Sequence, residues 1–305
     1  MAHEHPHGAH RAADRGALRS ALVLIAALMV AEVVAGLLTS SLALLSDAAH
    51  MLTDAAALAV SLWASKLAAK PARGAMTYGL GRAEILSAQA NGVTLLVLGV
   101  VIVLDAISRL ASAPSVDATP VLVVAIVGAA VNLVAARILA GPRTGQRSLN
   151  IEGSYRHILT DLYGFLATAV AAVVILTTGF ERADPIASLV ISALMLRAAY
   201  GLLKASGRVF MEAAPADMDP DEVGRALAAQ AGVVEVHDLH VWEVTSGFAA
   251  LSAHVVVRAG DDCHELRRTL QRVVEERFDL HHTTLQVDHE AAQQPPLQIE
   301  IKRRE

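Results

Sequence analysis

Two histidines each precede an aspartate by four residues, and both pairs lie in long apolar stretches. The pairs are His50 with Asp54, and His157 with Asp161. Side chains four residues apart lie on one face of a helix, one turn apart. A charge at the centre of a bilayer costs about 2.5–3.5 kcal/mol on insertion scales, so such residues indicate a functional site. If the two helices are neighbours, two imidazoles and two carboxylates converge, a four-ligand set that zinc binds tetrahedrally.

The same ligands can also hold protons. Histidine and aspartate bind a metal ion only when deprotonated, so these four residues can carry either metal or protons. Protonation on the far side of a membrane would weaken the ligation and release the ion, which is a physical basis for metal/proton exchange. The alternative is a purely structural hydrogen-bond network. Asp47, three residues before His50, either guides cations toward the site or interacts with the end of its helix.

The composition indicates a membrane protein. Of the 305 residues 54% are hydrophobic, and the mean hydropathy is +0.46. Charged residues make up 18%, against about 25% in typical globular chains, which excludes a disordered chain and disfavours an ordinary soluble enzyme. A spanning helix needs about 20 mainly apolar residues. Six stretches meet this requirement: 17–38, 42–66, 84–108, 117–139, 154–178 and 185–206.

Basic residues between these stretches predict the orientation. One side of the membrane receives most of them, and the other receives only Arg109 and Arg182. We therefore expect both termini in the cytoplasm. Short loops and the lack of a targeting segment favour a bacterial inner membrane. The segment 1–15 is either a disordered tail or a loose metal-collecting arm, with histidines at His3, His5, His7 and His10.

The chain becomes polar and acidic near residue 210. Residues 1–207 carry 15 basic and 12 acidic residues, whereas residues 208–305 carry 10 and 18. The acidity argues against a nucleic-acid partner, since phosphate binding needs a basic surface. The pattern predicts a small α+β domain, with a helix at 219–231, a hairpin of strands at 233–245 and 248–258, a helix at 262–279 and a strand at 283–289.

Seven histidines lie in this second domain. They are either ordinary surface residues or part of a regulatory metal site, because imidazole and carboxylate groups together suit zinc. A single cysteine, Cys263, excludes an intrachain disulfide framework and a zinc site of four cysteines. The histidines are His237, His240, His254, His264, His281, His282 and His289.

Five stretches together resemble the cation diffusion facilitator family of zinc and heavy-metal exporters, over nearly the whole chain. They are 41–54 (SLALLSDAAHMLTD), 78–86 (YGLGRAEIL), 157–161 (HILTD), 184–188 (DPIAS) and 236–242 (VHDLHVW). The resemblance implies six transmembrane helices followed by a small ferredoxin-like cytoplasmic domain, assembled as a homodimer. It also implies export of divalent metal from the cytoplasm in exchange for protons.

The resemblance also implies the site residues. The family's transport site falls on His50, Asp54, His157 and Asp161, and two histidines with two aspartates are typical of the zinc type. The family's cytoplasmic two-zinc site carries over to His237, His254, His264 and Asp288. A further family histidine near the last strand is replaced here by Gln286.

We therefore expect a secondary active transporter and not an enzyme. Its most favoured substrate is Zn²⁺, which is both transported and regulatory, with Cd²⁺ or Co²⁺ as alternatives, because imidazole favours these ions over hard cations. The competing interpretation is a membrane-bound metal sensor that binds without transport. The expected segments are a tail (1–15), the six-helix transport domain (16–210), a metal-binding dimerisation domain (211–291) and a second tail (292–305).

Overall fold

A computed structural model describes residues 7–39, 42–112, 117–141 and 148–290. Within these ranges, the side chains of residues 7–13, 32, 35–36, 38–39, 42–50, 53 and 112 lie outside the description. The chain forms two compact units, and each has a hydrophobic core of its own. The first unit runs to Phe210 and also includes Thr245–Gly247, and the second consists of the other residues after Phe210.

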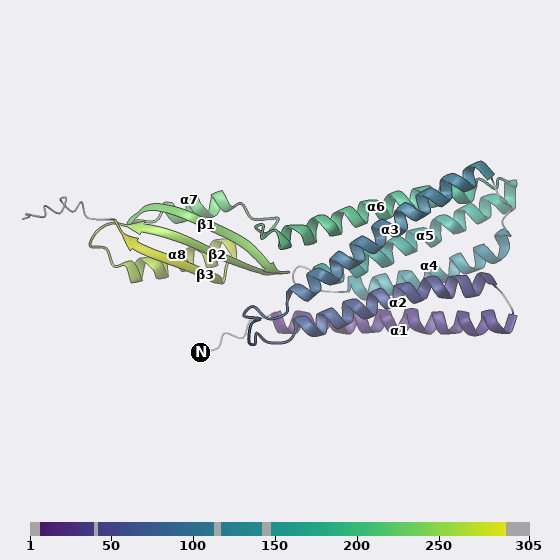
Figure 1. Ribbon diagram of the computed structural model, residues 1–305, viewed down its shortest axis with the longest axis horizontal. Coiled ribbons are helices and arrows are strands. Elements are labelled where there is room, and N and C mark those ends of the chain that lie inside the picture. Colours follow the sequence, from purple (N-terminus) through teal and green to yellow (C-terminus); the bar gives the residue numbers. More distant parts are fainter. Residues whose placement is uncertain (1–6, 40–41, 113–116, 142–147, 291–305) are drawn as a thin grey trace, which may run out of the picture. The chain divides into compact units, whose positions relative to one another are not determined.

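The first unit consists of six long helices that run side by side (Figure 1). Several of these helices are longer than the apolar stretches predicted from the sequence, because polar residues extend them at one or both ends. The first helix begins at His7, so part of the segment expected to be a tail is helical. The helices are α1 (His7–Thr39), α2 (Leu42–Ala68), α3 (Arg82–Ser112), α4 (Ala118–Ala140), α5 (Leu149–Thr178) and α6 (Ala183–Phe210).

Four of these helices, α3 to α6, are long and apolar enough to cross a membrane, with mean hydropathy between 1.9 and 2.4 over their most apolar windows. That finding covers the described residues, and α1 and α2 both include side chains outside the description. Many large apolar side chains of the four helices face outward, such as Leu104, Val123 and Val170. An apolar exterior on long helices is what a lipid environment requires.

Helix α5 has a central place in this unit, since it packs against α2, α3, α4 and α6. Ser148 caps its first turn by accepting a hydrogen bond from the amide of Ile151. Gly179 ends it in a left-handed conformation, with φ of 69°, and donates its amide to Ile175. Glycine takes this conformation without steric cost. Both ends of α5 are thus capped, so the positions of its buried residues along the helix are fixed.

The second unit is a small α+β domain. Asp219 and Asp262 each cap a helix with the side-chain carboxylate, a common signal for a helix start. The order of elements agrees with the sequence prediction: α7 (Pro220–Ala228), β1 (Val233–Thr245), β2 (Phe248–Val257), α8 (Cys263–Phe278) and β3 (His282–His289).

The three strands form one sheet in the order β1-β2-β3, and β2 pairs with β3 in parallel. Helices α7 and α8 cover one face, where Leu227 and Leu270 pack with Ala253, Val255 and their neighbours. Residues on β2 and β3 alternate between the two faces. The register that pairs His254 with Gln286 therefore puts His254, Gln286 and Asp288 on the face opposite the helices.

Candidate metal centre

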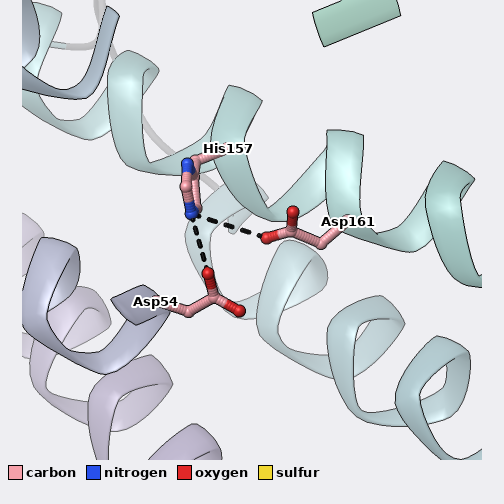
Figure 2. A group of neighbouring side chains, drawn as sticks. All are labelled: Asp54, His157 and Asp161. Atoms are coloured by element: carbon pink, nitrogen blue, oxygen red, sulfur yellow. Dashed lines mark hydrogen bonds and ion pairs between the residues drawn. The ribbon is translucent and has the colours of Figure 1, made fainter. Parts of the chain in front are cut away.

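Three ionisable side chains meet inside the helical unit. Asp54 comes from α2, and His157 and Asp161 come from α5 (Figure 2). Nε2 of His157 lies 3.0 Å from Oδ1 of Asp54 and 3.7 Å from Oδ2 of Asp161. One ligand atom from each residue lies within 4.8 Å of the other two. Among the described residues this is the only such group of three or more histidine, cysteine or acidic side chains.

The two helices position these groups in different ways. His157 and Asp161 share a face of α5 because they are four residues apart. Asp54 reaches them only because α2 packs against this face of α5, across 103 residues of sequence. Leu58 of α2 and Ile151 and Ile158 of α5 belong to one buried apolar cluster next to this contact. The apolar packing therefore sets the distance between the ligand atoms.

The site is shielded from solvent and strongly anionic. The side chains of Asp54, His157 and Asp161 are only 7%, 6% and 7% exposed. Two carboxylates held this close repel each other where the dielectric is low. A divalent cation between them would neutralise both charges at once, and a protonated imidazole neutralises one. The arrangement is suited to exchange between a metal ion and protons.

Nε2 of His157 faces the two carboxylates and is the atom on which this exchange would occur. At 3.0 Å from Asp54, Nε2 is placed to donate a hydrogen bond to the carboxylate when it carries a proton. A metal ion at the same nitrogen needs its lone pair, so the proton must leave before the ion can bind. Nδ1 of His157 is buried and has no hydrogen-bond partner among the described residues.

His50 and Asp47 lie on α2, and their side chains are outside the description. The helical backbone places His50 one turn before Asp54, on the same face of α2. Of the four N-terminal histidines, His3 and His5 lie outside the described residues, and His7 and His10 lie in α1 with side chains outside the description.

A second buried polar cluster, most of whose members the sequence patterns did not single out, lies between α2, α3 and α5. Its centre is the hydroxyl of Ser61, which is 2.9 Å from Ser154, 3.3 Å from Ser87 and 3.4 Å from the amide nitrogen of Asn91. Asn150 donates to the backbone carbonyl of Ser61 at 2.7 Å. The only available signal was spacing, since Ser61 lies seven residues after Asp54 and Asn150 seven before His157.

Two buried asparagines, Asn91 and Asn132, differ in their hydrogen bonds, although polar side chains in membrane helices commonly bond to a neighbouring helix. Asn91 of α3 bonds to Ser61 of α2 in this way. Asn132 of α4 instead donates to the carbonyl of Gly128, one turn earlier in its own helix. This bond forms because a carboxamide can reach the carbonyl four residues earlier without a partner helix.

The four residues expected to form a cytoplasmic metal site lie in three places. His237 and His254 are neighbours on β1 and β2, with ring centroids 5.4 Å apart. Asp288 on β3 accepts a hydrogen bond from Gln286, at 2.9 Å. His264 lies in the first turn of α8 and is exposed. Within the described part of one chain, these residues do not gather into a group of three ligand atoms.

Comparison with known families agrees with this architecture. The family described as the cation efflux transmembrane domain matches residues 18–211. The family described as the cation efflux protein cytoplasmic domain matches residues 215–290. Both compact units are therefore accounted for by matches to domains of cation efflux proteins.

Curated relatives match over nearly their full length. The cadmium, cobalt and zinc/H(+)-K(+) antiporter of Bacillus subtilis is 37% identical, covering 95% of this chain and 93% of the relative. The metal cation efflux system protein CzcD of Cupriavidus metallidurans is 38% identical, and the match covers 94% of this chain and 89% of the relative. The zinc transporter ZitB of Escherichia coli is 34% identical, and the match covers 97% of this chain and 95% of the relative.

Proposed function

Because this chain belongs to the cation efflux family of metal transporters, the cation diffusion facilitators, we propose that it exports divalent metal ions, with Zn²⁺ as the main substrate, in exchange for protons. The relatives named for zinc, cadmium and cobalt transport support this range of substrates. The observation that carries the proposal is the buried group of Asp54, His157 and Asp161.

The geometry of this group suits a tetrahedral ion. Zinc binds histidine nitrogen and carboxylate oxygen at about 2.0–2.2 Å, so two tetrahedral ligands lie about 3.3 Å apart. The separations of 3.0 Å and 3.7 Å around Nε2 of His157 bracket that value. We propose His50 as the fourth ligand, from the turn of α2 before Asp54. Mixed imidazole and carboxylate ligands also accept Cd²⁺ and Co²⁺. For Asp47, we propose a part in guiding cations to the site.

Proton exchange follows from the ligands themselves. The imidazole and both carboxylates must be deprotonated to hold the metal, and each can take a proton when the metal leaves. Arrival of protons would weaken the ligation and return the site to its unloaded form. The name of the Bacillus subtilis relative, which includes H(+) and K(+), supports coupling of this kind. The protein would thus be a secondary active transporter.

We also propose the orientation that the basic residues predict, with both termini in the cytoplasm. Lys66 and Lys70, at and just after the end of α2, and Arg137 in the last turn of α4 would then lie on the cytoplasmic side. The named bacterial relatives support a bacterial inner membrane. The unit after Phe210 would accordingly be a cytoplasmic domain.

For this cytoplasmic domain we propose dimerisation and a regulatory metal site. The family match to the cation efflux cytoplasmic domain supports dimerisation. On the sheet face opposite α7 and α8, His237 and His254 are adjacent, and the strand register adds Asp288 to the same face. His264 remains a candidate ligand from α8. For the histidine-rich N-terminal segment, we propose weak metal collection.

Zinc flux into proteoliposomes under an imposed pH gradient tests the transport proposal. The variants are Asp161→Ala and His50→Ala, and the matched control is Asp105→Asn, an exposed acid of α3 that pairs with Arg109. We expect uptake that depends on the gradient in the wild type and the control, and none in either site variant. Binding of zinc by calorimetry without flux of zinc, cadmium or cobalt would instead indicate a membrane-bound metal sensor.

A further inference from the structure

A continuous series of buried polar side chains extends from the metal centre along three helices. On α2 it includes Ser61 and Ser65, and on α3 it includes Glu84, Ser87 and Asn91. On α5 it includes Asn150 and Ser154. These seven residues, called the polar seam below, are at most 4% exposed. Their spacings of three, four and seven residues place them on one face of each helix.

The polar seam leads away from the metal centre in one direction. Ser61 follows Asp54 by seven residues on α2, and Asn150 precedes His157 by seven residues on α5. Seven residues are two turns, or about 10 Å along a helix. The contact of Ser61 with Asn150 therefore repeats the contact of Asp54 with His157, two turns closer to the expected cytoplasmic side. Glu84, in the first turn of α3, extends the series with a buried carboxylate.

The polar seam has more hydrogen-bonding capacity than its own members use. The hydroxyl of Ser65 and the carboxamide oxygen of Asn150 are buried and have no hydrogen-bond partner among the described residues. A buried acceptor without a partner is costly, so such groups point to a ligand or water at some stage of function. Four of the seven side chains are serines and therefore small, and Gly153 brings α5 close to Ala88 and Asn91 of α3.

We propose that the polar seam is the cytoplasmic access route of the metal ion, closed in this structure by the hydrogen bonds of Ser61. When these bonds part, the oxygens of Ser61, Ser65 and Asn150 line a path for a hydrated divalent cation from Glu84 to Asp54. Neutral oxygens can replace part of the water around the ion without holding it tightly, because the carboxylates lie only at the two ends. This proposal rests on the proposed transport function.

Closure by Ser61 follows from the number of its contacts. Its hydroxyl joins three neighbours, Ser87, Asn91 and Ser154, and its carbonyl accepts from Asn150. One small residue thus connects α2 to both α3 and α5. Loss of the hydroxyl would weaken the closed arrangement while changing little volume. A control is Ser206 of α6, which is equally buried but, within the described part of the chain, bonds only to carbonyls of its own helix.

The test combines thiol labelling with transport. The background is the full chain with Cys263→Ser, and the reporter is Ser65→Cys. Inside-out vesicles expose the cytoplasmic side to a membrane-impermeant methanethiosulfonate reagent. We expect slow labelling of the reporter, and labelling about tenfold faster with Ser61→Ala, because each buried hydrogen bond lost shifts the equilibrium several-fold. Ser206→Ala is expected to leave the rate unchanged.

Zinc uptake without the reporter gives the second measurement. A larger open population lowers the KM for zinc on the cytoplasmic side, while slower closure lowers the maximal rate. We expect both changes in Ser61→Ala and Asn150→Ala, and neither in Ser206→Ala. Equal labelling and equal KM in Ser61→Ala and Ser206→Ala, with normal wild-type flux, would overturn the access route alone. Absence of wild-type flux for any of the three metals would remove the transport function and the access route together.

Discussion

Oδ1 of Asp54 lies 3.0 Å from Nε2 of His157, although 103 residues separate the two in the chain. The contact joins α2 to α5 at a point where both side chains are almost fully buried. It is close enough for a hydrogen bond and also for two ligands of one zinc ion. The same pair of atoms can therefore be bridged by a proton or by a metal, and the first two predictions follow from this.

Removal of either partner is expected to weaken zinc binding by at least about 100-fold, since loss of even an outer partner of a metal site costs about 10–100-fold. The variants are Asp54→Asn and His157→Gln, which keep the volume of each side chain approximately constant. Calorimetric titration of the detergent-solubilised protein with zinc measures the change. Asp105→Asn, on the exposed face of α3, should bind as the wild type does, and equal affinities in all four proteins would exclude this site.

Zinc affinity is expected to fall as the pH falls. A ligand must lose its proton before the metal can bind, so each proton displaced raises the apparent Kd by about tenfold for each unit of acidification, or 1.36 kcal/mol. Titrations in buffers of different ionisation enthalpy count the protons released. The His157→Gln variant should release fewer protons than the wild type, and release of the same number would show that Nε2 does not exchange a proton for the metal.

Packing between α4 and α5 depends on the absence of a side chain at Gly128. A Cβ atom there would lie 2.5 Å from Cε1 of Phe165, whereas a Cβ at Gly164 would meet only Ile191, at 3.7 Å. Both changes to alanine remove the same backbone freedom, so their difference isolates the steric effect. We expect Gly128→Ala to be less stable than Gly164→Ala by about 1–3 kcal/mol, the usual cost of overpacking.

Thermal unfolding in detergent ranks these variants. A second change, Phe165→Leu, removes the ring that the new methyl group would meet, so it should restore most of the stability lost in Gly128→Ala. A melting temperature of Gly128→Ala at or above that of Gly164→Ala would show that the ring moves aside without cost.

The stability of the cytoplasmic domain is expected to depend on the charge of Asp262. The amides of Glu265 and His264 donate to its carboxylate, at 3.1 Å and 2.9 Å, and lower its pKa from the ordinary value of 3.8. Because the folded pKa lies below the unfolded one, the charged cap stabilises the domain fully above pH 3.8. This contribution is lost as the pH falls through the folded pKa.

The fluorescence of Trp242 in a Trp63→Phe background follows unfolding of this domain in the full chain, since the sequence has two tryptophans. Asp262→Ala should lower the melting temperature at neutral pH, and the difference from wild type should shrink below the ordinary pKa. Asp262→Asn keeps an acceptor oxygen and should retain more stability. A difference that stays constant with pH would show that the charge is not involved.

Local spacing explains most of what could be predicted about the fold. Apolar stretches of about 20 residues predicted the six long helices, and the patterns at 233–245 and 248–258 predicted the two strands of the hairpin. The sequence also predicted the types of the metal ligands, because ionisable residues inside apolar helices are rare and cost free energy to bury. Apolar stretches did not predict the helix ends, because polar residues such as Arg11 and Asn150 continue a helix beyond its apolar part.

The sequence by itself determined which side chains share a helix face and what chemistry they offer, because a helix has a regular period. Only the tertiary structure decided which faces meet. It placed Asp54 against His157, joined Ser61 to α3 and α5, and left Asn132 bonded within α4. These contacts depend on the packing of apolar surfaces between helices that are distant in sequence, and that packing has no signature in local spacing.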